Sequence, residues 1–182
     1  MKKNYLTQFK IPVVWNLKEF NFEWQESYCI NRTEGKDKWP LPSAETAILD
    51  KCFEEWNVNR EGTKHYHSHI ANIEQEIFNL LPGKNHLQNF LKLTPGNVIP
   101  WHYDTFRYYI KTNNVNDTDV RSVHRILIFV EDWKVGQIVQ FGKKIVSHWK
   151  AGDCFTWNRN LWHGACNFGN KDLIMMQVNF QM

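Results

Sequence analysis

Two histidines and one aspartate are the residues of this chain whose types and spacing could do chemistry. His102 and Asp104 stand two residues apart, and His163 follows far downstream. On an extended strand, side chains two residues apart leave the same face. Two imidazoles and one carboxylate on one face of a metal ion leave the remaining positions open, as in non-haem Fe(II) centres. We therefore predict a metal centre made of His102, Asp104 and His163.

The second half of the chain has the pattern of a small β-barrel, which could bring these residues together. Short apolar runs are separated by turn signals such as Pro95-Gly96, Ala151-Gly152 and Gly169-Asn170. The predicted strands are Asn89–Leu93, Val98–Tyr103, His124–Glu131, Gln137–Phe141, Lys144–Trp149, Asp153–Trp157, Trp162–Asn167 and Asp172–Asn179. Eight such strands predict a mainly β fold, a double-stranded β-helix (jelly-roll, cupin-like) over residues 86–182.

Residues 1–85 are expected to brace this barrel within a single domain, 1–182. Helices are predicted from Ser43 and over Ser68–Leu81, where Pro82-Gly83 ends the second one. The alternating histidines His65, His67 and His69 could hold a metal if extended. Because they precede a predicted helix and have no carboxylate at ligand spacing, we interpret them as its solvated entrance.

One long polar segment, Thr105–Ser122, directly follows the His102–Asp104 pair. Most connections in compact domains are shorter, and long ones beside a site are usually functional. We expect this segment to act as a lid or a substrate clamp.

Composition argues against two classes of partner. The net charge is +3, from 22 basic and 19 acidic residues that are scattered along the chain, so nucleic acid is not expected. No apolar run approaches the roughly 18 residues needed to cross a bilayer, so no membrane association is expected. The N-terminus lacks the apolar stretch of a secretion signal, and a cytoplasmic location is expected.

Several segments together carry a resemblance to a known superfamily. The chain resembles the Fe(II)/2-oxoglutarate-dependent oxygenases over about residues 88–180, nearest the aspartyl/asparaginyl β-hydroxylase-like or prolyl-hydroxylase-like branch. The segments that carry it are Pro100-Trp101-His102-Tyr103-Asp104, Arg125–Trp133, Trp149-Lys150-Ala151-Gly152-Asp153 and His163-Gly164-Ala165-Cys166-Asn167.

The resemblance implies that His102, Asp104 and His163 hold Fe(II) and that 2-oxoglutarate is the co-substrate. With O₂, the reaction would hydroxylate an amino acid, a peptide side chain or a small metabolite and release succinate and CO₂. The family usually places an Arg or Lys on the last strand to bind the 5-carboxylate of 2-oxoglutarate, but that position here is Leu173. Arg125 and Lys171 are the candidate replacements, and Arg107 is a further possibility.

Two alternatives stay open. A cupin-like protein could bind a metal or small ligand without 2-oxoglutarate chemistry, although cupins usually offer His-x-His and a Glu, and this chain has only Asp104 beside His102. The second alternative is a jelly-roll used only for recognition. The observation in its favour is that position 173, where the family usually has an Arg or Lys, is a leucine.

Overall fold

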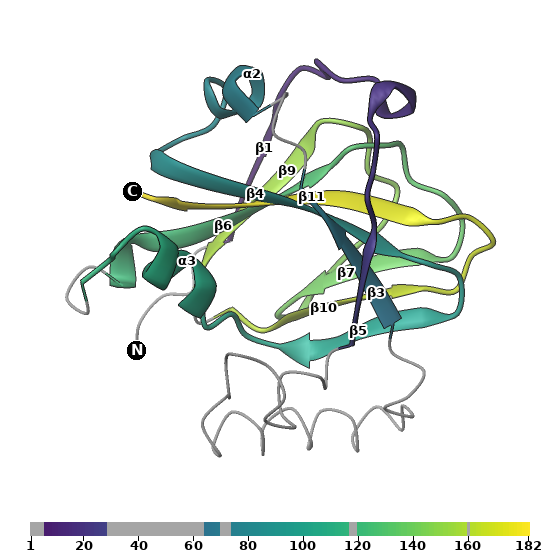
Figure 1. Ribbon diagram of the computed structural model, residues 1–182. Helices are drawn as coiled ribbons and strands as arrows, with labels where there is room; N and C mark the ends of the chain where they lie inside the picture. The colour runs from purple at the N-terminus through teal and green to yellow at the C-terminus, as the bar shows by residue number, and fades with distance from the viewer. Residues whose placement is uncertain (1–5, 29–63, 70–73, 117–119, 160) are drawn as a thin grey trace.

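The strands of the chain form two antiparallel sheets that face one another (Figure 1). The computed structural model describes residues 6–28, 64–69, 74–116, 120–159 and 161–182. In these ranges the helices are α2 (Glu74–Phe78) and α3 (Arg107–Thr112), with 3₁₀ turns at Leu17–Glu19 and Val120–Ser122. The strands are β1 (Leu6–Lys10), β2 (Gln25–Tyr28), β3 (Lys64–Ser68), β4 (Lys84–Leu93), β5 (Asn97–His102), β6 (Val123–Phe129), β7 (Gln137–Phe141), β8 (Lys144–Val146), β9 (Asp153–Asn158), β10 (His163–Asn167) and β11 (Leu173–Gln181).

The strand order is that of a jelly-roll. The large sheet runs β1-β9-β6-β11-β4-β3-β2 and the small sheet runs β5-β10-β7-β8. From β4 to β11 the chain therefore distributes four strands to each sheet in an interleaved order, which is the double-stranded β-helix. The predicted mainly β, jelly-roll fold is confirmed.

Strand β6 shows why this sequence forms a layered structure. Its run Ile126-Leu127-Ile128-Phe129 is buried on both faces. Leu127 and Phe129 join the core between the two sheets, while Ile126 and Ile128 belong to a second cluster on the outer face of the large sheet. A strand buried on both sides reads as a continuous apolar run instead of an alternating one.

The N-terminal part of the chain covers that outer face. Aromatic and aliphatic side chains of the extended segment after β1 pack on it together with Ile77 and Phe78 of α2. Trp15 also donates its indole N–H to the Val130 carbonyl at 2.9 Å. In Figure 1, this segment and α2 lie above the long strands, on the side opposite to β5 and β10.

The structure corrects three predicted elements and does not test a fourth. The helix predicted over Ser68–Leu81 is wrong in extent, because Ser68 ends strand β3 and the described helix is Glu74–Phe78. The helix predicted from Ser43 lies outside the described residues. The strand predicted to Trp149 ends at Val146, close to His148, whose φ of 57° departs from extended backbone. The segment predicted as a loop, Thr105–Ser122, contains α3.

Two glycines provide a test of how tightly the turns of the barrel are packed. Gly136 and Gly96 both have positive φ, but a Cβ on Gly136 would lie 2.3 Å from the Gly169 backbone nitrogen, whereas one on Gly96 would meet nothing within 4 Å. We expect Gly96→Ala to cost about 1 kcal/mol of unfolding free energy, and Gly136→Ala to cost a further 1–3 kcal/mol or so. Urea unfolding of both variants checks this, and equal losses would contradict it.

Candidate metal centre

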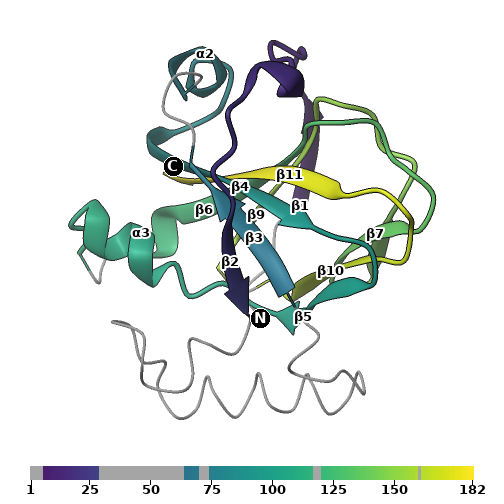
Figure 2. The same ribbon diagram turned by 45° about the vertical axis from the view of Figure 1, so that its right-hand side comes forward.

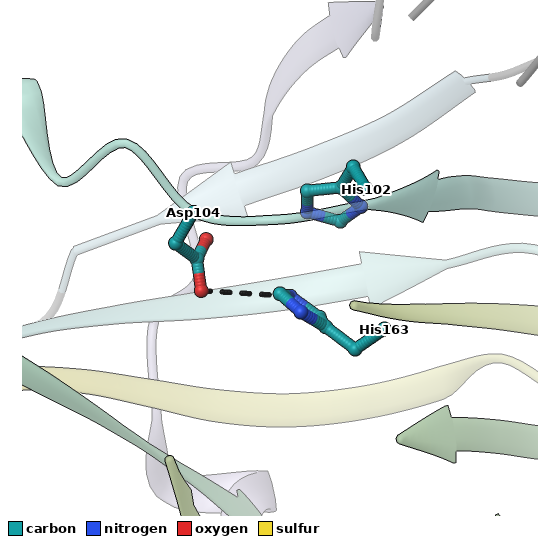
Figure 3. A group of neighbouring side chains, drawn as sticks. All are labelled: His102, Asp104 and His163. Atoms are coloured by element: carbon teal, nitrogen blue, oxygen red, sulfur yellow. Dashed lines mark ion pairs between the residues drawn. The ribbon is translucent and has the colours of Figure 1, made fainter. Parts of the chain in front are cut away.

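The pairing of β5 with β10 brings the two predicted histidines together. His163 lies directly opposite His102 in the antiparallel register, and their ring centroids are 4.3 Å apart. Asp104 follows two residues after His102, just beyond the end of β5, and its carboxylate points toward His163 (Figure 3). One ligand atom from each of the three residues lies within 4.8 Å of the others. Two segments far apart in the sequence, the end of β5 with the residues after it and the start of β10, thus converge on one point.

The hydrogen bonds of the two imidazoles determine which nitrogen is available to a metal. Nδ1 of His102 lies 2.7 Å from the Pro100 carbonyl oxygen, and Nδ1 of His163 lies 2.9 Å from the Leu161 carbonyl oxygen. Because a carbonyl can only accept, each Nδ1 carries the proton and each Nε2 carries a lone pair. Metal-bound histidines are commonly oriented by such a backbone partner.

A row of three side chains on the large sheet holds the Asp104 carboxylate. Trp157 of β9, Arg125 of β6 and Asn179 of β11 are cross-strand neighbours in register. Nη1 of Arg125 lies 2.5 Å from Oδ1 of Asp104, and the Trp157 indole N–H donates to Oδ2 at 3.1 Å. Asn179 accepts from Nε of Arg125 at 2.9 Å. The carboxylate is thereby oriented from the sheet opposite to the one that supplies the histidines.

These contacts determine the charges of the site. Burial alone would raise the pKa of the Asp104 carboxyl, but Arg125, the two imidazoles and the Trp157 hydrogen bond outweigh it and hold that pKa below its usual range. Burial lowers the pKa of His163 to about 3, although Asp104 acts in the opposite direction. At neutral pH the site therefore contains an ionised carboxylate and a neutral His163, the forms that bind metals.

The residues present fit a divalent metal ion. Nε2 of His163 is buried and has no hydrogen-bond partner among the described residues, although Oδ2 of Asp104 lies 3.5 Å away. A buried nitrogen lone pair aimed at a carboxylate oxygen is unfavourable without a proton or a cation between them. His102, Asp104 and His163 could therefore hold a metal ion, and in the described part of the chain no other group of three such side chains converges.

The three residues stand at the side of a large cavity between the sheets. Its volume is about 590 Å³, within the range of sites that take small organic ligands. Apolar side chains of the core between the sheets line part of it: Leu91, Leu127, Val139, Phe141 and Met175.

Helix α3 and the residue before it cover part of the cavity. Phe106 takes a left-handed conformation with φ of 55°, and its ring lies 5.3 Å from the Arg125 guanidinium carbon. Tyr109 is buried and donates its hydroxyl to the Asn85 carbonyl at 2.7 Å, which ties α3 to β4. Burial raises the pKa of Tyr109 to about 12, so the hydroxyl remains a donor. Residues 105–109 of the expected lid therefore line the cavity.

The three side chains considered as binders of the 2-oxoglutarate 5-carboxylate, Arg125, Lys171 and Arg107, lie in different places. Arg125 and Arg107 both line the cavity, and Arg125 is bonded directly to Asp104. Lys171 lies exposed in the turn before β11 and is not among the residues that line the cavity. The structure thus brings Arg125 together with the predicted metal ligands and leaves Lys171 apart from them.

Sequence reasoning missed the role of several residues in this site. Trp157 and Asn179 contact the Asp104–Arg125 pair only because strand register places them beside Arg125. His65 and His67 of β3 and His69, directly after it, line the cavity, so the interpretation of these residues as a solvated helix entrance is wrong. The alternation of histidines at every second position was the available signal for a strand with one face toward a site.

Comparisons with known proteins give little information about the function of this site. No protein-family model matches the chain, and no curated protein matches it. Among solved structures, a Pseudomonas putida prolyl-4-hydroxylase aligns over 88% of this chain and 92% of its own, at 16% identity and a TM-score of 0.44. The Schizosaccharomyces pombe Cnp3 cupin domain aligns over 92% and 89%, at 11% identity and a TM-score of 0.40. A predicted oxalate decarboxylase of Thermotoga maritima covers 65% and 82%, at 19% identity and a TM-score of 0.40.

At these values the likeness carries no information on activity, which has to be argued from the residues of this chain. None of the helices in the described ranges combines the length and the apolar character that crossing a bilayer requires.

The low pKa of His163 predicts an acid-sensitive fold. The unfolded chain binds a proton at His163 below about pH 6.5, whereas the folded chain does so only near pH 3, so stability falls as pH falls through this window. We expect a loss on the order of 2–4 kcal/mol between pH 7 and pH 4. Guanidinium unfolding of the metal-free protein measures it, and His163→Gln should show a shallower pH dependence. An identical slope in the variant would contradict this assignment.

Proposed function

We propose that this protein is an Fe(II)- and 2-oxoglutarate-dependent oxygenase. It would hydroxylate an amino acid, a peptide side chain or a small metabolite, using O₂ and releasing succinate and CO₂. One observation carries the proposal: two Nε2 lone pairs and one ionised carboxylate converge beside a cavity large enough for organic ligands. A 2-His-1-carboxylate set leaves metal positions open for other ligands, and such sets are typical of this chemistry.

The residues of the chain would divide the work as follows. His102, His163 and Asp104 would hold Fe(II), and bound iron would supply the open positions for 2-oxoglutarate and O₂ and the redox chemistry. Arg125 and Trp157 orient the Asp104 carboxylate through Oδ1 and Oδ2. His163, Asp104 and Trp157 are almost fully buried, which limits the access of water to this end of the cavity.

Two guanidinium groups are candidates for binding the 5-carboxylate of 2-oxoglutarate. Arg125 reaches the site from an inner strand of the barrel, and Arg107 reaches the cavity from the start of α3. A guanidinium carries five N–H donors in a planar fork that suits carboxylates. We propose Arg125 as the anchor because it lines the cavity and contacts the metal ligand Asp104 directly, with Arg107 as the second candidate.

A cupin-like protein that binds a metal or small ligand without 2-oxoglutarate is the second candidate function. The observation in its favour is that Arg125 is engaged by Asp104 and Asn179, which is the arrangement of a residue that orients a metal ligand. The exposed position of Lys171, outside the cavity, points in the same direction.

Anaerobic spectroscopy tests the oxygenase proposal. Addition of Fe(II) and then 2-oxoglutarate should produce a weak visible charge-transfer band, and Asp104→Ala should abolish it because the variant lacks the carboxylate ligand. Admission of O₂ should then release succinate from the native protein. A protein that binds Fe(II) but gives no band and no succinate is the cupin-like alternative.

A second measurement identifies the co-substrate anchor. Mn(II) affinity is determined first, and 2-oxoglutarate affinity is then determined at saturating Mn(II), for Arg125→Gln, Arg107→Gln and the control Lys171→Gln. We expect Arg125→Gln to weaken 2-oxoglutarate binding by roughly 2–5 kcal/mol and metal binding by about 10–100-fold. The control should leave both unchanged.

If Arg107→Gln alone weakens 2-oxoglutarate binding, Arg107 is the anchor, and the role of Arg125 is only to orient the Asp104 carboxylate. If neither arginine variant weakens it, the co-substrate assignment is wrong, while the metal assignment is unaffected.

A further inference from the structure

Two carboxamide side chains stand opposite one another where the large sheet lines the cavity. Asn89 of β4 and Gln177 of β11 are partners in the antiparallel register, and both line the cavity. Figure 2 shows β4 and β11 side by side in this sheet, between β6 and β3. Directly opposed residues have Cβ atoms about 5 Å apart, so both side chains can reach one ligand group. We call Asn89 and Gln177 the amide pair.

The amide pair lies next to the row of side chains that holds Asp104. Gln177 precedes Asn179 by two residues on β11, and Asn179 accepts a hydrogen bond from Nε of Arg125 at 2.9 Å. Arg125 in turn is paired with Asp104. Two residues of a strand span about 7 Å. A ligand group on the amide pair would therefore share the cavity with the metal ligands without taking their place.

Apolar side chains adjoin the amide pair on the same face of the sheet. Leu127 is the partner of Gln177 on β6, and Met175 and Leu91 stand two residues further along β11 and β4. All three line the cavity and are almost fully buried. In such surroundings a polar group is costly unless it is hydrogen-bonded, so the amide pair is an exception that a ligand would explain.

Most of the hydrogen-bonding capacity of the amide pair is unused within the part of the chain that the structure describes. A carboxamide has two N–H donors and one oxygen with two lone pairs. Asn89 uses one of these positions, because its Nδ2 lies 2.5 Å from Nδ1 of His67. The Gln177 side chain makes no hydrogen bond to any described residue. Both side chains therefore keep donors and acceptors for a group in the cavity.

These remaining donors and acceptors determine which ligand group fits. A ligand that displaces water from them has to reproduce the hydrogen bonds of that water. A carboxylate only accepts, so it would leave the two amide oxygens without donors, whereas an amide both donates and accepts in one plane. The amide pair is itself uncharged, and the adjoining charged groups, Arg125 and Asp104, are paired with each other. The site thus favours a neutral amide.

We propose that Asn89 and Gln177 bind an amide group, a peptide group or a carboxamide, of the primary substrate. That the amide belongs to a substrate rests on the proposed function, whereas its binding rests on the amide pair alone. Leu91, Leu127 and Met175 would contact the apolar part of the substrate beside the amide. They would also keep water from its hydrogen bonds, which are stronger in a site of low dielectric constant.

Four probes with equal numbers of non-hydrogen atoms test the proposal on the full, metal-free chain without any activity measurement. Pentanamide carries a carboxamide, N-methylbutanamide a peptide-like amide, pentanoate a carboxylate and hexanol a hydroxyl. The side-chain amide signals of Asn89 and Gln177 in NMR spectra report binding at constant pH and ionic strength. Gln75, exposed on α2 and outside the cavity lining, is the internal control whose signal should not respond.

We expect saturable shifts of both signals, with the better of the two amides binding about tenfold more tightly than pentanoate or hexanol, the effect of about one hydrogen bond. Tighter binding of pentanamide identifies a carboxamide as the substrate group, and tighter binding of N-methylbutanamide identifies a peptide group. Equal affinities of all four probes, tighter binding of pentanoate or hexanol, or no saturable shift would overturn the proposal.

Variants decide whether the amide pair itself makes this distinction. Gln177→Met keeps the length of the side chain but removes its amide, so it should lower the affinity for the better amide about tenfold and leave that for hexanol unreduced. Binding is then read from the Asn89 signal. Asn89→Ala, read from the Gln177 signal, gives the same test if Gln177→Met does not fold, and Gln75→Met is the matched control. An amide preference that survives in a folded variant of the pair contradicts the assignment.

The two proposals fail in distinguishable ways. A preference for amides without the Fe(II)–2-oxoglutarate band would overturn the oxygenase assignment alone. The band without a preference for amides would overturn the assignment of the amide pair alone.

Discussion

The antiparallel pairing of β5 with β10 is the constraint on which the candidate site depends. It places His163 directly opposite His102, and Asp104 follows just beyond the end of β5, where Arg125 and Trp157 hold its carboxylate beside His163. A shift of this register by one residue would turn every side chain of a strand to the other face. The apolar residues of β10 and its neighbour β7 that face the core therefore maintain the histidine pair as well as the barrel.

Asp104 links the two sheets of the barrel at this point. The residue follows a strand of the small sheet, but Arg125 and Trp157 of the large sheet hold its carboxylate. A buried carboxylate is costly unless it is paired and hydrogen-bonded. The same contacts that offset this cost also orient both oxygens of the carboxylate, so local stability and the geometry of the metal centre depend on the same group of atoms.

The N-terminal part of the chain has two structural roles. Its aromatic side chains cover the outer face of the large sheet, where β6 would otherwise expose Ile126 and Ile128 to water. Its strand β3 extends that sheet, and His65 and His67 of β3, together with His69 after the strand, line the cavity. The N-terminal part of the chain thus has both roles. It covers the outer face of the large sheet, and its strand β3, which extends that sheet, lines the cavity.

The sequence by itself determined the jelly-roll, because turn residues and alternating apolar positions mark most of its strands locally, and it indicated the His102–Asp104 pair through the two-residue period. It did not reveal β3, whose alternating residues are polar histidines and whose strand conformation depends on pairing with β2 and β4. Lys171 shares its parity with Leu173, but the strand begins only at Leu173, so parity did not bring it to the cavity. Only the tertiary structure decided that Trp157, Arg125 and Asn179 lie in one row beside Asp104, because strand register is set by contacts between segments far apart in the chain.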